Sequence, residues 1–144
     1  MTSLREKLES AFKVYLGQTI TTDVYTGLGS FEVDYPAVIC SYLGGEDIHP
    51  EANTVRAEMM LTVISSADPE TVENAAEVHN TLFGKVVEAC ESDTLAGDVM
   101  GAGNGLLVNG IVSTSEEQPD VESDNNGKPT FSSSYTIRLI AGHN

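Results

Sequence analysis

The sequence has very few positively charged residues. It contains 7 Lys and Arg against 22 Asp and Glu, which gives a formal net charge of −15 at pH 7. Because proteins bind nucleic acids largely by neutralising phosphates with Lys and Arg, this balance excludes an ordinary phosphate-binding groove. An acidic surface can still serve a nucleic acid by repelling it, so that the polymer passes without sticking. From the charge alone, plain solubility or adaptation to a salty environment is the simpler interpretation.

Long apolar runs, tryptophan and cysteine motifs are also lacking. No segment approaches the ~20 apolar residues that a membrane span needs, and the N-terminus is amphipathic rather than a signal peptide. Because Trp is absent, we expect a mostly aliphatic core. Cys40 and Cys90 lie in apolar segments without CxxC spacing, which favours buried free thiols in a reducing compartment over a disulfide. We therefore expect a protein that is made and kept in a cytoplasm.

The longest predicted element is an amphipathic helix over Asp68–Cys90, within a single domain that spans residues 1–144. Asp68 can cap its N-terminus, and Pro69 suits the first helical position. Its apolar residues recur at intervals of three and four: Val72, Ala75, Ala76, His79, Leu82, Phe83, Val86 and Cys90. A helix with one apolar face needs a sheet or a second helix to cover it.

A first helix is predicted over Thr2–Leu16, where Ser3 and Glu6 fit a capping box and Gly17 ends the helix. Its buried stripe consists of Leu4, Leu8, Phe12 and Tyr15. The residues expected to face water are Arg5, Glu6, Lys7, Glu9 and Lys13.

The remaining elements are mainly strands. We expect them at Thr19–Val24, Pro36–Leu43, Thr54–Ser65, Leu106–Ser115 and Thr130–Ala141, with a short helical piece at Thr94–Met100. Two acidic loops, Gly44–Asn53 and Glu116–Pro129, would join consecutive strands as hairpins. We therefore predict an α+β fold: a mainly antiparallel sheet of four to five strands, two helices packed on one face, and long projecting hairpin loops.

The motifs that would carry chemistry are incomplete. The glycines of Gly101–Leu106 precede a strand rather than following one, and they miss the last position of a GxGxxG phosphate loop. The acidic run from Asp120 lacks the Gly and the final Glu of a calcium-binding loop. His49, His79 and His143 show no metal-ligand spacing, and the position of His79 is typical of a hydrogen-bonded core histidine. We expect no enzyme, no cofactor and no metal site.

The order of the elements resembles that of a known family. The stretches that carry the resemblance are LREKLESAF, YPAVIC after a Gly-rich connection, VRAEMMLTVIS leading into DPETVENAAEVHNTLFGKV, and the final long hairpin. Together they resemble the tail terminator proteins of long-tailed bacteriophages, also called tail completion or neck proteins. The resemblance covers nearly the whole chain, in architecture rather than in a signature motif. It implies a virion structural protein of the tail and neck, assembled in the host bacterial cytoplasm, with no catalytic residues.

The resemblance also implies partners. A hexameric ring of the chain would sit on the head-proximal end of the tail tube, end tube polymerisation and join the tail to the head connector. The partners would be further copies of the chain, the tail tube protein and the head connector or stopper protein, while DNA passes through the lumen without specific binding. The candidate ring-lumen or subunit-contact residues are Glu46, Asp47, Glu116, Glu117, Asp120, Glu122 and Asp124.

Two other functions stay open. The chain could be another neck protein, such as a head-closure or head–tail connector subunit, because neighbouring rings share fold and composition. It could also be a soluble ligand-binding module of a cellular organism, with a pocket between the sheet and the helices.

Overall fold

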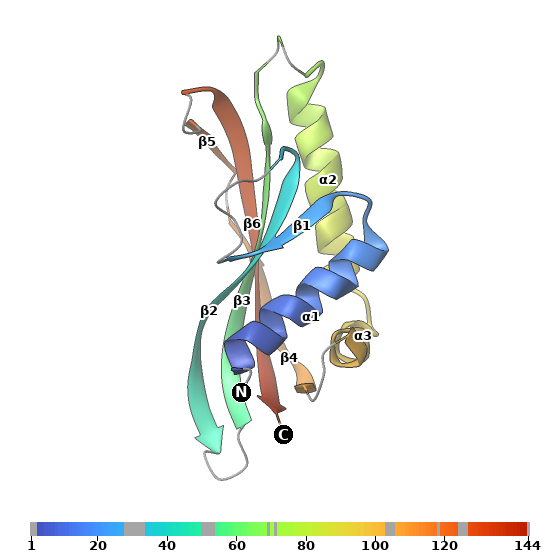
Figure 1. The fold of residues 1–144 in the computed structure, drawn as a ribbon, viewed down its shortest axis with the longest axis vertical. Coiled ribbons are helices and arrows are strands. Elements are labelled where there is room, and N and C mark those ends of the chain that lie inside the picture. The colour runs from blue at the N-terminus through green and yellow to red at the C-terminus, as the bar shows by residue number, and fades with distance from the viewer. Residues whose placement is uncertain are drawn as a thin grey trace.

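The computed structural model describes residues 3–27, 34–49, 54–68, 70, 72–102, 106–117, 119–123 and 127–143. Within these residues the fold is α+β, with a six-stranded mixed sheet and three helices (Figure 1). The elements are α1 (Leu4–Thr19), β1 (Asp23–Thr26), β2 (Ala37–His49), β3 (Thr54–Ser66), α2 (Ala75–Cys90), α3 (Leu95–Ala102), β4 (Leu106–Glu116), β5 (Asp120–Ser123) and β6 (Pro129–His143). The predicted class is confirmed, whereas the predicted counts of four to five strands and two helices are too low.

The sheet has the strand order β1-β2-β3-β6-β4, with β5 also paired to β6. β1 runs parallel to β2, and the other pairs are antiparallel. A parallel pair cannot be joined by a tight hairpin, and ten residues, 27–36, separate β1 from β2 in the sequence. The sheet is therefore mainly antiparallel, as predicted, with one short parallel strand at its edge.

β3 and β6 form the centre of the sheet. Their pairing runs without a register shift from Thr54 opposite Gly142 to Ser66 opposite Thr130. Along β3, buried side chains alternate with half-buried ones, and the buried set is Ala57, Met59, Leu61, Val63 and Ser65. The sequence predicts this alternation, because successive residues of a strand point to opposite faces of the sheet.

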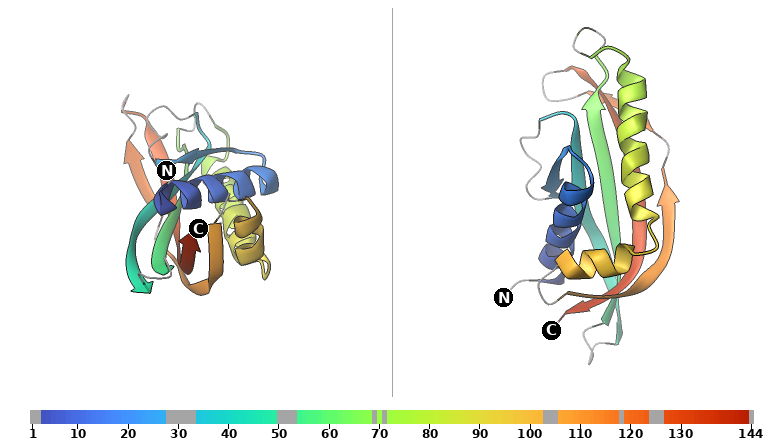
Figure 2. Two further views of the ribbon diagram at one scale, coloured as in Figure 1. Left: turned by 60° about the horizontal axis from the view of Figure 1, so that its bottom comes forward. Right: turned by 90° about the vertical axis from the view of Figure 1, so that its right-hand side faces the viewer.

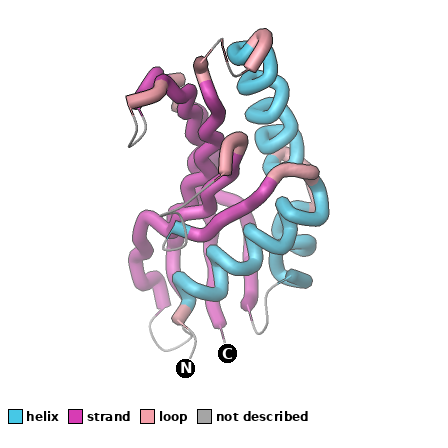
Figure 3. The backbone as a smooth tube through the Cα atoms, turned by 45° about the horizontal axis from the view of Figure 1, so that its top comes forward, coloured by secondary structure: helices cyan, strands magenta, loops and turns pink. Residues whose placement is uncertain are grey.

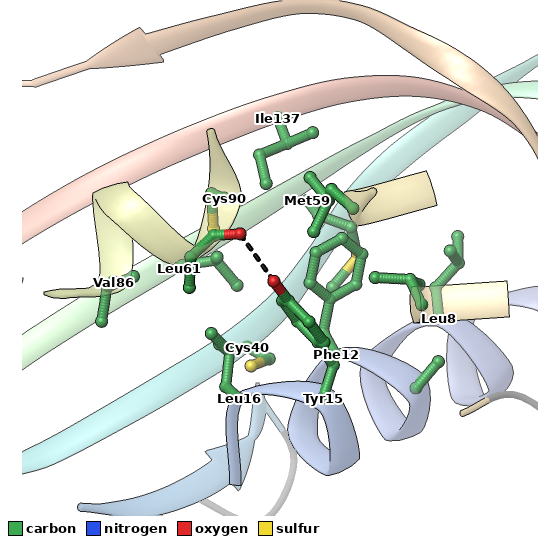
Figure 4. Close-up of a cluster of buried hydrophobic side chains, with 14 of the residues drawn as sticks. Leu8, Phe12, Tyr15, Leu16, Cys40, Met59, Leu61, Val86, Cys90 and Ile137 are labelled. Atoms are coloured by element: carbon green, nitrogen blue, oxygen red, sulfur yellow. Dashed lines mark hydrogen bonds between the residues drawn. The ribbon is translucent and has the colours of Figure 1, made fainter. Parts of the chain in front are cut away.

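All three helices lie on one face of the sheet (Figures 2 and 3). α1 packs against β1 and β2, α2 against β3 and β6, and α3 against α1 and β4. Figure 4 shows the hydrophobic cluster between them, in which the Tyr15 hydroxyl donates a hydrogen bond of 2.7 Å to the carbonyl oxygen of Ala89. This bond ties α1 to the end of α2. No helix in the described part of the chain is long and apolar enough to cross a membrane.

α2 begins later than predicted. The sequence predicts a helix from Asp68, but α2 begins at Ala75, after a turn in which Val72 N–H donates to the Asp68 carbonyl oxygen. Asp68 Oδ1 accepts a hydrogen bond from Glu70 N–H, so the capping carboxylate serves this turn instead of the helix. Asn74 has φ of 55°, a left-handed conformation that separates the turn from α2. The predicted stripe is buried at His79, Leu82, Val86 and Cys90.

The two predicted acidic loops are largely strand. β2 continues through Gly44 to His49. Gly44 has φ of 151° and lies at a register shift between β2 and β3. A bulge at this point accommodates Gly44 and Gly45 within the strand, so the strand does not end there. The range Glu116–Pro129 contains the end of β4, the whole of β5 and the start of β6. The prediction of loops is therefore wrong at Gly44–His49 and at Asp120–Ser123, because acidic residues that suit a loop are also compatible with a strand whose side chains face solvent. Residues 50–53, 118 and 124–126 of the two predicted loops lie outside the described residues.

α1 has the predicted start but a different end. Ser3 Oγ accepts a hydrogen bond of 3.2 Å from Glu6 N–H, which confirms Ser3 as the N-cap. The helix continues through Gly17 to Thr19, whose hydroxyl donates to the carbonyl oxygen of Tyr15. Glycine ends a helix where it adopts a left-handed conformation, and Gly17 does not adopt one.

Glu9 is buried, with only 5% of its surface exposed, although the sequence predicts that it faces water. Its Oε2 accepts a hydrogen bond of 2.9 Å from Tyr42 N–H and lies 3.5 Å from Arg5 Nε. Tyr42 stands at the register shift in β2. The carboxylate therefore joins α1 to the irregular point of β2, and this contact explains a charged residue within the buried side of the helix.

Replacing Glu9 by Leu is expected to lower the free energy of unfolding by about 1.5–3 kcal/mol, the net contribution of a hydrogen bond to a charged group. Glu9→Gln keeps a carbonyl oxygen at the end of the side chain, so it is expected to lower the free energy of unfolding by less than Glu9→Leu does. Urea unfolding of both variants and the wild type measures the difference. A Glu9→Leu variant as stable as the wild type would contradict the role assigned to the carboxylate.

Candidate interaction surfaces

The predicted candidate residues fall into two groups at opposite ends of the sheet. The first group, on β2, is Glu46 and Asp47. The second group, at the end of β4 and on β5, is Glu116, Glu117, Asp120 and Glu122. Asp124 lies outside the described residues. The β6 residues at the levels of Glu46, Glu116 and Asp120 are Ile140, Tyr135 and Ser132, so at ~3.4 Å per residue Glu46 lies about 17 Å from Glu116 and about 27 Å from Asp120 along the strands. The structure therefore does not bring the candidates together in one site.

Glu46 lies beside a shallow hollow on the face of the sheet opposite the helices. The hollow has a volume of about 300 Å³ and is lined by Gly44, Gly45, Glu46, Arg56, Ala57, Glu58 and Arg138. Arg138 Nη2 lies 2.8 Å from Glu58 Oε1, in an ion pair whose side chains are 45% and 34% exposed. Exposed pairs of this kind contribute ~0–1 kcal/mol, so the pair does little for stability. Charges of both signs give this end of the sheet a mixed polar surface.

The second group has an ordered backbone and exposed side chains. Glu117 N–H donates a hydrogen bond of 3.1 Å to the carbonyl oxygen of Ser134, and Thr130 Oγ1 donates one of 3.4 Å to the carbonyl oxygen of Glu122. The side chains of all four described residues in this group are exposed. This end of the sheet is therefore acidic, and such a surface repels a polyanion and attracts a basic partner.

The outer edge of β4 is a surface that the sequence patterns did not predict. Every residue from Ile111 to Glu116 is exposed, and Val112 and the β5 residue Val121 are 52% and 69% exposed. β4 contains neither Pro nor Lys, two residues that commonly protect a strand edge from pairing with another chain. Its pairing with β6 has register shifts between Val108 and Gly110 and between Ile111 and Ser113, so Val112 lies at an irregular point of the strand. The adjacent apolar pair Ile111-Val112 is the signal that could have found this surface, because two successive strand residues cannot both face one core.

A groove of about 490 Å³ lies between α2 and the end of β4. Its apolar part is formed by Phe83 and Val87, which are partly buried against the core. Glu88, Glu91 and Glu116 line it as well, together with the small or neutral residues Asn80, Gly84 and Ser92. Among the residues that the structure describes, no three His, Cys, Asp or Glu side chains are placed to hold a metal ion. The groove thus combines an apolar strip with a spread of negative charge.

His79 joins α2 to the two central strands. Its Nδ1 lies 2.7 Å from Ser65 Oγ on β3, and its Nε2 lies 2.7 Å from Ser133 Oγ on β6. The side chain is 2% exposed, and its ring centroid lies 5.6 Å from that of Phe131. Burial lowers the pKa of His79, because the charged imidazolium loses its hydration. The prediction of a hydrogen-bonded core histidine is confirmed, and a substrate cannot reach this closed cluster.

The two cysteines are free and buried, as predicted. Burial raises the pKa of the Cys40 thiol, and it raises the pKa of the Cys90 thiol to about 12. A thiol acts as a nucleophile or a metal ligand through its thiolate form. Both cysteines are therefore small apolar core residues at neutral pH.

The buried His79 is expected to make the fold less stable in mild acid. In the unfolded chain the imidazole takes up a proton near its ordinary pKa of 6.5, whereas in the folded chain its pKa is lower. The unfolded state therefore binds more protons, and stability present above pH 6.5 is lost as the pH falls toward the lowered value. Urea unfolding between pH 7.5 and pH 5.5 measures this loss. In the control His79→Gln the slope with pH should be smaller, and equal slopes for the two proteins would contradict the account.

The sequence matches no model of a known protein family and no curated protein. The features of the described residues that bear on function are the acidic end of the sheet, the mixed polar end, the exposed edge of β4 and the groove beside α2.

Proposed function

We propose that the chain is a phage virion structural protein that forms a ring at the head-proximal end of the tail tube. There it ends tube polymerisation and joins the tail to the head connector. The observation that carries this proposal is the exposed edge of β4 from Ile111 to Glu116. An exposed edge strand with apolar side chains is a surface for another chain. Cyclic homo-oligomers cover such surfaces by giving each subunit the same neighbour.

The charge of the chain supports a lumen through which DNA passes. A net charge of −15 per subunit gives a ring a strongly negative wall, which repels phosphates and keeps DNA from binding there. The described members of the candidate set for this wall or for the subunit contacts have exposed carboxylates at Glu46, Glu116, Glu117, Asp120 and Glu122. Asp47 lies beside Glu46 on β2 and belongs to the same candidate group.

The two ends of the sheet differ in charge, which supports a position of the ring between two different partners. One end carries Glu46, Arg56 and Arg138, with charges of both signs, and the other carries the acidic strand β5. A ring between a tail tube and a head connector needs one end for each, and different surfaces let each end select its own partner. Another neck protein would use the same arrangement, so the position along the neck decides between the two functions.

Tube assembly tests the proposal. The tail tube protein of the same genome, purified and allowed to polymerise, should stop growing at one end when the chain is added, and electron microscopy should show a ring there. Leu82→Asp is the matched control: Leu82 is 8% exposed, so the variant buries an unpaired charge, unfolds and leaves growth unchanged. Tubes that grow equally with the wild type and the control contradict the proposal. A ring found only on the head side of the neck assigns the chain to the other neck function.

A further inference from the structure

The groove between α2 and β4 is lined by carboxylates from two elements. Glu88 and Glu91 stand on its α2 side and Glu116 on its β4 side, and its described lining residues include no Lys or Arg. Lys85 is the one lysine or arginine of α2, and it lines a separate hollow with Glu77. A basic group that enters the groove therefore meets three carboxylates and no competing cation.

A buried hydroxyl without a hydrogen bond lies at the end of this groove. Tyr135 on β6 is 2% exposed and stands directly opposite Glu116 of β4. Burial raises the pKa of Tyr135, and the charges of Glu91 and Glu116 raise it further, so the hydroxyl lies near both carboxylates, where the end of α2 approaches β4. The Thr114 hydroxyl is near enough to lower this pKa in part, but the two hydroxyls do not reach hydrogen-bond geometry. Among the buried side chains that the structure describes, only the Tyr135 hydroxyl is left without a partner.

An unpaired buried hydroxyl points to a group that comes from outside the chain. Buried polar groups in proteins almost always have a hydrogen-bond partner, because an unpaired one loses its hydration without compensation. The hydroxyl oxygen of Tyr135 can accept a hydrogen bond, and the nearby Glu91 and Glu116 favour a donor that carries positive charge. The three groups together therefore suit a cationic side chain with several N–H donors.

The middle of α2 leaves room for such a group. Gly84 lines the groove, and a Cβ atom added to it would meet nothing within 4 Å. Glycine weakens a helix relative to alanine, and the packing of this fold does not require a glycine at this position. Phe83 and Val87, beside it, offer partly buried apolar surface. The groove can therefore hold an apolar side chain against α2 while a longer basic side chain reaches the carboxylates.

We propose that the α2–β4 groove binds an arginine side chain of a different protein, carried beside an apolar residue. A guanidinium has five N–H donors in a planar fork, enough for Glu91, Glu116 and the Tyr135 hydroxyl together, and it stacks on aromatic rings such as that of Phe83. A lysine ammonium is a compact, strongly hydrated charge and suits this set less well. The inference goes beyond the proposed ring and does not depend on it.

Charge favours another protein over a second copy as the occupant. Every arginine of this chain already has a carboxylate beside it. The neighbours are Glu9 for Arg5, Glu58 for Arg138, and Glu46, on the adjacent strand, for Arg56. The net charge of −15 also makes two copies repel each other. A basic segment of another protein meets neither obstacle.

NMR titration of the isotope-labelled chain with the capped tripeptide acetyl-Leu-Arg-Leu-amide tests the site. The backbone amides of Gly84, Val87 and Ser92, which line the groove, should shift on binding. The same peptide with citrulline in place of arginine keeps the shape without the charge, and it should bind about tenfold more weakly or worse. The lysine peptide should fall between the two.

Paired variants locate the binding. Glu91→Gln and Glu116→Gln should each weaken binding of the arginine peptide by about tenfold, whereas Glu77→Gln, exposed on α2 but lining the other hollow, should not. Gly84→Leu fills the groove without a clash and should abolish binding. Its control is Gly97→Leu, which adds the same side chain at an exposed glycine of α3.

Tyr135→Phe tests the buried hydroxyl by itself. Because this hydroxyl makes no hydrogen bond in the free chain, urea unfolding should find the variant at least as stable as the wild type, while the arginine peptide binds several-fold more weakly. A variant that loses stability and keeps full binding would show that the hydroxyl serves the fold and would overturn its assigned role.

The remaining outcomes decide the site and its occupant. A failure of the arginine peptide to bind, equal binding of the arginine and citrulline peptides, or binding that survives Gly84→Leu overturns the site. Shifts of the same groove amides when the chain alone is concentrated make a second copy the occupant and overturn the choice of a different protein. None of these results depends on tube growth, which tests the proposed function separately.

Discussion

The pairing of β3 with β6 is the constraint on which the rest of the structure depends. It runs unbroken from Thr54–Gly142 to Ser66–Thr130, and it sets Leu61 beside Tyr135 and Met59 beside Ile137 on one face. Burying an aliphatic or aromatic side chain of this size stabilises a fold by about 1.5–3 kcal/mol, and the helices can bury these side chains only from that face. The pairing also places β3 and β6 at the centre, so that β1 and β4 form the edges.

Polar contacts then fix where the helices lie on this apolar face. Glu9 binds the irregular point of β2, Tyr15 binds the end of α2, and His79 bridges Ser65 and Ser133 on the central strands. Buried polar groups are costly unless their hydrogen bonds are made, so each contact favours one position of its helix over its neighbours. The position of α2 in turn forms the groove beside β4, and the position of α1 sets which of its residues face outward.

Helices, strands and caps that are set by residue spacing within one segment could be predicted from the sequence. The alternation in β3, the N-cap at Ser3 and the stripe containing His79 all follow from spacing alone. The buried role of Glu9 could not be predicted, because its partner is the backbone amide of Tyr42, far away in sequence.

The acidic stretches Gly44–Asn53 and Glu116–Pro129 were predicted as loops for a similar reason: their pairing partners lie elsewhere in the sequence. Whether Asp120 belongs to a loop or to a strand depends on its neighbour Ser132 in β6, and composition does not report that neighbour. The groove between α2 and β4 joins parts of the chain whose closeness is set by the sheet order. The candidate carboxylates were identified as surface residues, but their division into two distant groups required the register of β2, β5 and β6.

Amide hydrogen exchange of the whole chain tests most directly whether the β3–β6 pairing holds the fold together. The slowest amides are expected to lie in residues 57–63 and 135–141 and to exchange only through global unfolding, while residues 111–116 of β4 exchange much faster. If α2 keeps the slowest amides while β3 and β6 exchange early, the account is contradicted.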